Sequence, residues 1–76
     1  MNFSRAEKVF RLTPRQSEVA RRVGAGIARK QIADEMKISI RTVDGFLEKI
    51  RLKCAAKSTF ELVYIFSHYL PRRGSR

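Results

Sequence analysis

The side chains best suited to chemistry in this chain gather between Ser39 and Lys53, where hydroxyl, basic and acidic residues alternate with apolar ones. Basic side chains and hydroxyls donate to phosphate oxygens, and a carboxylate can accept from the N4 amino group of cytosine in the major groove. If the segment is helical, its polar residues share one face. That face carries Arg41, Thr42, Asp44, Gly45, Glu48, Lys49 and Arg51. The pattern indicates recognition of DNA.

The helix that must carry this face is predicted over residues 40–54, with Ser39 as its N-terminal cap. Its apolar stripe, with Phe46 beside it, consists of Val43, Leu47, Ile50 and Cys54. A shorter helix is predicted over about residues 29–36, with buried positions at Ile32, Ala33 and Met36. The three residues Lys37-Ile38-Ser39 between the helices leave room only for a turn, in which Ile38 fills the core. A short helix, a tight turn and a second helix form the unit that presents a helix to the major groove.

Two further helices flank this unit. Thr13-Pro14-Arg15-Gln16 predicts a helix start with a capping box between Thr13 and Gln16, and Gly24-Ala25-Gly26 predicts its end. The apolar face of this helix is Val19, Ala20 and Val23. Ser58 and Glu61 predict a second capping box, opening a last helix that Pro71 closes. The expected fold is all-α, with four helices over residues 12–70.

The ends of the chain are expected to lie outside this domain. Residues 1–11 are predicted to form an arm or a short extra helical turn through Phe3, Val9 and Phe10. Residues 71–76 are basic and offer no apolar anchor, which predicts a disordered tail.

Composition favours a folded, DNA-binding class of protein. The 76 residues suffice for one domain, and 43% of them are hydrophobic, which argues against disorder. A formal net charge of +10 raises the local concentration of a phosphate backbone. The single Cys54 excludes an internal disulfide, and its place on the apolar stripe makes it a small core residue. No apolar run approaches the length of a membrane span, so a cytoplasmic protein without membrane contact is expected.

Catalysis and cofactor binding find no support in the sequence. There is no glycine-rich phosphate loop and no nucleophile beside a plausible base, and the glycines at 24 and 26 are interpreted as a helix stop. His68 is the only histidine, so a surface or interface position is favoured over metal ligation. We therefore expect no enzyme activity, no cofactor and no metal.

The register of these motifs resembles the LuxR-type, or GerE-like, helix-turn-helix domain of bacterial regulators. The resemblance runs ungapped over about fifty residues. It rests on LTPRQSEV from Leu12, Gly26-Ile27, Lys30-Gln31-Ile32-Ala33, Ile38-Ser39, Arg41-Thr42-Val43, Leu47, Ile50, Lys53, Thr59 and Glu61-Leu62. It implies a compact four-helix domain whose third helix enters the major groove and whose fourth helix often forms a two-fold dimer contact.

The resemblance and the helical geometry together predict a DNA-contacting set. Lys30, Arg41 and Thr42 are placed for phosphate contact at the starts of their helices, and Lys49 and Lys53 for tracking the backbone. The full predicted set is Lys30, Arg41, Thr42, Val43, Asp44, Gly45, Glu48, Lys49 and Lys53.

The chain departs from the family pattern on the base-reading face, where Asp44, Gly45 and Phe46 stand in place of basic or small apolar residues followed by histidine. Asp44 and Glu48 add two negative charges one helical turn apart. Either Asp44 reads a cytosine, or it pairs with Arg41, Lys49 or Arg51 and points to solvent.

The last helix carries more apolar side chains than one core face needs. Its predicted core positions are Leu62, Ile65, Phe66 and Tyr69. Val63, Tyr64 and Leu70 are then left outside, and such a patch usually marks an interface. A homodimer contact is preferred over packing by the N-terminal Phe3, Val9 and Phe10.

Together these features predict a stand-alone bacterial transcription regulator, nucleoid-associated, that binds a two-fold site on double-stranded DNA as a homodimer. RNA polymerase or a related regulator is a further expected partner. Two alternatives stay open. One is a small antagonist that heterodimerises with a related regulator, which Asp44, Gly45 and Glu48 favour. The other is a promoter-recognition module like the C-terminal region of a sigma factor.

Overall fold

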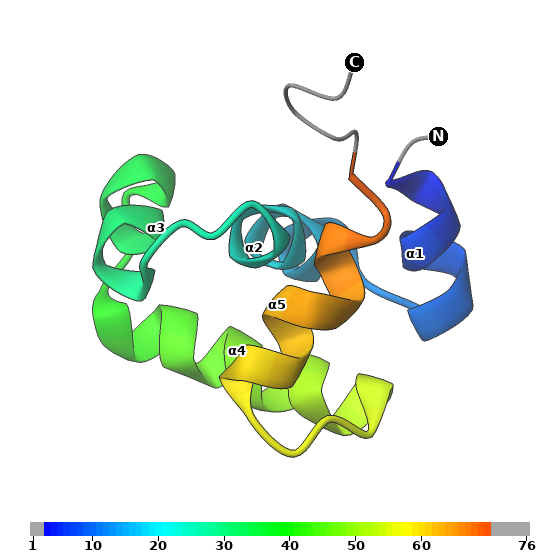
Figure 1. The fold of residues 1–76 in the computed structure, drawn as a ribbon. Coiled ribbons are helices and arrows are strands. Elements are labelled where there is room, and N and C mark those ends of the chain that lie inside the picture. Colours follow the sequence, from blue (N-terminus) through cyan, green and yellow to red (C-terminus); the bar gives the residue numbers. More distant parts are fainter. Residues whose placement is uncertain (1–2, 71–76) are drawn as a thin grey trace.

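The computed structural model describes residues 3–70, which form five α-helices and no strand (Figure 1). The helices are α1 (Ser4–Phe10), α2 (Pro14–Gly24), α3 (Arg29–Met36), α4 (Ile40–Cys54) and α5 (Thr59–Ser67). The expected all-α fold is confirmed, and so are the predicted ranges of α3 and α4. The segment before Leu12, predicted as an arm or a helical turn, forms the helix α1.

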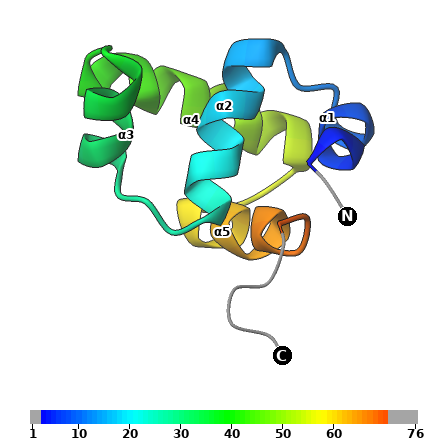
Figure 2. The same ribbon diagram turned by 90° about the horizontal axis from the view of Figure 1, so that it is seen from above.

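Helix α2 lies at the centre of the fold and packs against α3, α4 and α5. In Figures 1 and 2, α3 and α1 lie at opposite ends of the molecule, with α2 between them. The core draws side chains from all five helices, and the apolar faces predicted for α2, α3 and α4 all contribute to it. Its fully buried large side chains are Phe66, Ile32, Ile50, Leu62, Val19 and Val43.

The N-terminal caps explain where α2, α4 and α5 begin. At Thr13 the capping box is complete: Thr13 Oγ1 accepts from the Gln16 amide, and Gln16 Oε1 accepts from the Thr13 amide. At Ser58 the predicted box is only half formed. Ser58 Oγ accepts from the Glu61 amide, but Glu61 Oε1 accepts from the amide of Lys57, one residue earlier than the box requires.

Helix α5 ends at Ser67, earlier than the predicted stop at Pro71. The amides of His68, Tyr69 and Leu70 each bond to the carbonyl three residues before, so the chain tightens into turns after Ser67. A residue that precedes proline is also disfavoured in helical conformation. The predicted tail, residues 71–76, lies outside the described residues.

Helix α1 is joined to the core through aromatic packing and one polar bond. The rings of Phe3 and Phe10 each lie 5.7 Å from the ring of Phe66, and Phe3 is buried. Ser17 Oγ, buried in α2, donates to Glu7 Oε2 of α1. The N-terminal segment therefore packs against the last helix. From the sequence, this packing was considered but a homodimer contact was preferred. Val9 does not take part, since it is 57% exposed.

Cys54 lies half-buried at the end of α4 and packs against the core cluster, as its place on the apolar stripe predicts. Burial raises the pKa of its thiol to about 11, because desolvation disfavours the thiolate. The thiolate is the nucleophilic form of cysteine, so Cys54 is an inert packing residue near neutral pH.

Gly24 sets the distance between α2 and α5. A methyl group at this position would lie 2.8 Å from Cβ of Phe66 and 2.9 Å from its carbonyl carbon. The second atom belongs to the backbone of α5, so a side chain at Gly24 would have to push the two helices apart. Gly24 thus serves the close helix contact, whereas the left-handed residue that follows α2 is Gly26, at φ 83°.

We predict that Gly24→Ala lowers the free energy of unfolding by about 1–3 kcal/mol, because the added methyl overpacks the α2–α5 contact. Gly45→Ala is the matched control, since a methyl at that position of α4 meets nothing within 4 Å. The control should gain up to about 1 kcal/mol from better helix propensity. Urea unfolding followed by circular dichroism measures both, and equal effects of the two substitutions would contradict the role given to Gly24.

Candidate nucleic-acid interface

Helices α3 and α4 form a helix-turn-helix with a three-residue connection. Lys37 ends α3 in the left-handed conformation, at φ 58°, and the amide of Ile38 bonds to the carbonyl of Ala33. Ile38 is half-buried and packs against the core cluster, as predicted. Ser39 then begins α4, because its Oγ accepts from the Thr42 amide at 3.0 Å. The direction in which α4 leaves α3 is therefore fixed by the left-handed Lys37, the half-buried Ile38 and the cap at Ser39.

The polar face predicted for α4 is exposed along the helix, apart from Arg51, which is half-buried. The expected DNA-contacting residues on it are Arg41, Thr42, Asp44, Gly45, Glu48 and Lys49. Lys30 on α3 is exposed as well. The one member of the predicted set that this geometry corrects is Val43. Its side chain is 0% exposed in the core, so it cannot reach a ligand in solution.

Asp44 is engaged by a cation that the sequence did not suggest. Arg29 Nη1 donates to both carboxylate oxygens of Asp44, at 2.7 and 2.9 Å. The predicted partners of Asp44 were all on its own helix, whereas Arg29 begins α3, fifteen positions earlier in the chain. No local spacing rule connects two residues that only the turn between the helices brings together. The pair neutralises one of the two acids on the exposed face and links the starts of α3 and α4.

The other acid, Glu48, has only a loose partner. Its nearest cation is Arg51 Nη2 at 4.0 Å, one turn along α4. The hydroxyl of Thr42 lies 2.9 Å from Ser39 Oγ, so Thr42 takes part in the start of α4 while staying exposed. This is the local role that competes with a DNA contact by Thr42.

Lys53 holds the far end of α4 in place. Its ammonium donates to the carbonyl oxygen of Arg11 at 2.6 Å and to Oε1 of Gln16 at 2.7 Å. Gln16 lies in the first turn of α2 and Arg11 is the C-terminal cap of α1, so the end of α4 is bonded both to α2 and to the link that precedes it. A phosphate contact by Lys53 stays a prediction, and it would compete with these two bonds.

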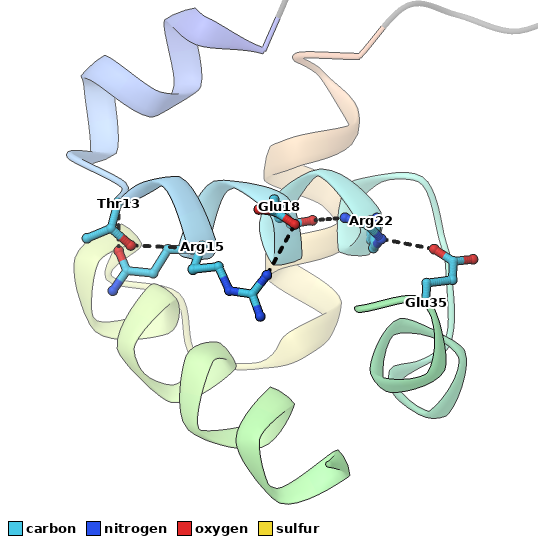
Figure 3. Close-up of polar contacts among 6 residues, drawn as sticks. Thr13, Arg15, Glu18, Arg22 and Glu35 are labelled. Atoms are coloured by element: carbon cyan, nitrogen blue, oxygen red, sulfur yellow. Dashed lines mark hydrogen bonds and ion pairs between the residues drawn. The ribbon is translucent and has the colours of Figure 1, made fainter. Parts of the chain in front are cut away.

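Helix α3 is also fastened to α2. Arg22 Nε donates to Glu35 Oε1 at 2.9 Å, and Figure 3 shows this bond crossing from α2 to α3. Gln31 Nε2 supports the same carboxylate from within α3, at 3.1 Å. Both helices of the helix-turn-helix are therefore bonded to α2. Glu35 of α3 is bonded to Arg22, and Lys53 at the end of α4 is bonded to Gln16.

A second exposed surface lies on α5, where Phe60 and Tyr64 are 84% and 69% exposed and one helical turn apart. We call these two residues the aromatic pair. Of the predicted dimer residues, Tyr64 is outward as expected, whereas Val63 and Leu70 are half-buried and pack against the core. The early end of α5 explains Leu70, which follows a turn instead of continuing the helix. Phe60 was not predicted as an outward residue; it lies in the first turn of α5, before the first predicted core position, Leu62.

Within residues 3–70, no group of three or more potential metal-ligating side chains comes together. No helix in the same part of the chain is long and apolar enough to cross a membrane.

Comparison with protein families gives one match. Residues 11–66 match the GerE family model, which describes bacterial regulatory proteins of the luxR family. The matched region holds α2 to α4 and nearly all of α5, whereas α1 precedes it. No curated protein and no solved structure matches the chain.

The Arg29–Asp44 pair makes a prediction for DNA affinity. Arg29→Ala should weaken binding, because it leaves the Asp44 carboxylate uncompensated beside DNA phosphates, and Asp44→Ala should strengthen it by freeing the guanidinium. The double variant should lie near the parent protein, because the two single effects have opposite sign and the face then carries the same net charge as in the parent. Fluorescence anisotropy with a labelled duplex measures all four proteins. A loss of affinity in Asp44→Ala, confined to sites with one particular cytosine, would instead assign Asp44 to base reading.

Proposed function

The chain belongs to the luxR family of bacterial regulatory proteins, and we propose that it regulates transcription by placing α4 in the major groove of double-stranded DNA. The observation that carries this proposal is the exposed polar face of α4, presented by a helix-turn-helix whose both helices are bonded to α2. A rigid scaffold with one solvent-facing polar helix is what major-groove binding requires. We further propose a bacterial protein that acts in the cytoplasm on the nucleoid.

Phosphate contacts supply most of the affinity in this proposal. Lys30 on α3 and Arg41 and Lys49 on α4 are exposed and basic, as phosphate contacts require. The net charge of +10 favours association with any duplex. Lys53 has a positioning role here, because its ammonium is already bonded to the start of α2.

We predict that Lys30→Ala weakens binding to all DNA sequences alike. Loss of one phosphate contact should reduce the slope of log K against log salt by about 0.9. Lys8→Ala is the matched control, since Lys8 is an exposed lysine on α1, at the end of the molecule away from α3 (Figure 1). Anisotropy titrations at several salt concentrations measure the slopes. An unchanged slope in Lys30→Ala, or an equal change in both variants, would remove Lys30 from the interface.

We also propose that the protein binds as a homodimer through the aromatic pair on α5. Large exposed aromatic side chains next to each other are unusual on a monomer and common in interfaces. A two-fold contact repeats the same patch on both subunits, so Phe60 and Tyr64 of one copy would meet those of the other. The two α4 helices would then lie about 34 Å apart, which places half-sites about 10 bp apart or at a multiple of that spacing.

We predict that Tyr64→Asp abolishes the dimer while the monomer stays folded, because the carboxylate is costly in a buried interface but remains hydrated at this exposed position. DNA affinity should fall with it. Val9→Asp is the control, since Val9 is a similarly exposed apolar residue on α1. Sedimentation of both variants and the parent decides the question. A parent protein that is monomeric at tens of micromolar would refute the homodimer.

A second candidate function is a small antagonist that pairs with a related regulator and reads no DNA itself. Glu48 favours it, because this exposed carboxylate is only loosely paired and would face the phosphates. Asp44 favours it less than its sequence position suggests, since Arg29 compensates its charge. Tight, sequence-selective DNA binding by the unaltered protein would exclude this candidate in its pure form.

RNA polymerase is a further proposed partner of the DNA-binding protein.

A further inference from the structure

The exposed face of α4 is hollowed at Gly45. Thr42, Phe46 and Lys49 surround the glycine at helical spacing and wall an open recess of about 250 Å³. Most of the surface that lines this recess is apolar. Phe46 is half-buried and packs against the core, so it forms a fixed side of the recess.

The fold itself gives no reason for a glycine at this place. Gly45 lies inside α4 and has no positive φ, and a methyl group there would meet nothing within 4 Å. A glycine inside a helix costs roughly 0.5–1 kcal/mol relative to alanine. Gly24, by contrast, is required by the close approach of α5. The remaining use of a glycine in a helix is to let another molecule come close to the backbone.

We propose that this recess receives the 5-methyl group of a thymine and so makes α4 selective for a T·A pair in each half-site. The inference rests on the proposed function, since it assumes that α4 lies in the major groove. The thymine methyl is the apolar group that base pairs present there. The charge at the rim fits the same occupant: the Lys49 ammonium can reach a phosphate while its stem lines the recess. Of the two acids on this face, Asp44 is held by Arg29, and Glu48 lies 4.0 Å from Arg51 Nη2.

Because the lining of the recess is mostly apolar, it distinguishes bases by apolar contact and not by hydrogen bonding. Uracil, which differs from thymine only in lacking the methyl, keeps every Watson–Crick and groove hydrogen bond. Replacing thymine by uracil therefore removes the proposed contact and leaves the phosphate contacts unchanged. The expected loss is roughly fourfold in affinity, which corresponds to about 0.8 kcal/mol for one buried methyl.

The experiment begins with selection of the best duplex from a random pool, followed by replacement of each thymine in turn by deoxyuridine. One position in each half-site should lose roughly fourfold in affinity. Gly45→Leu fills the recess and should abolish the thymine-over-uracil preference at that position. Leu52→Ala is the control, since Leu52 is an exposed apolar residue on the same helix that does not border the recess. It should keep the preference. Circular dichroism verifies folding, and Gly45→Gln, which also places a long side chain at the recess, serves if the leucine variant is unfolded.

The outcomes separate this inference from the proposed function. Salt-dependent binding with no uracil-sensitive thymine would overturn the recess while leaving DNA binding intact. A uracil-sensitive position that keeps its preference in the Gly45 variants would assign the methyl to another residue, and also overturns the inference. No binding to any duplex would refute both.

Discussion

Phe66 of α5 is the side chain on which the packing of the whole fold depends. The backbone of α2 lies against it at Gly24, and the rings of Phe3, just before α1, and of Phe10, in α1, also pack against it. Because α2 in turn carries the bonds to α3 and α4, the position of the helix-turn-helix depends on the distance between α2 and α5. A displacement at Phe66 would therefore reach the exposed face of α4, although no residue near Phe66 belongs to that face. The exposed face of α4 and the core are therefore structurally linked.

The helix-turn-helix could be predicted from the sequence because its signals are local. Ser39 caps α4, the apolar residues Val43, Leu47 and Ile50 repeat at helical spacing, and three residues between the helices leave no alternative to a turn. Helix α1 gives no such signals. It has no side-chain cap, and it is held by contacts with Phe66 and Ser17, which lie far along the chain. The end of α5 was misplaced for a related reason, since a proline limits a helix without fixing its last residue.

The exposed face of α4 could be predicted from the sequence, but the contacts that its side chains make with other helices could not. Periodicity identifies the side of α4 that is exposed, and it also shows why Val43, which is part of a recognised motif, belongs to the core. It cannot identify Arg29 as the partner of Asp44, or the bonds from Lys53 to the start of α2. Those contacts depend on how separate helices lie in space. They matter for the site because Arg29 compensates the charge of Asp44 on this face, and because the ammonium of Lys53 already has two partners with which a phosphate would compete.

The bonds at the two ends of α4 have a thermodynamic consequence. Arg29 holds its first turns to α3, and Lys53 holds its last turn to α2. A helix fixed in this way has few orientations left to lose when a ligand arrives. Association can then proceed as a rigid-body event, in which the conformational entropy of the contacting helix has already been given up during folding. The heat capacity change of binding should accordingly reflect the contact surface alone, without the additional burial that accompanies coupled folding.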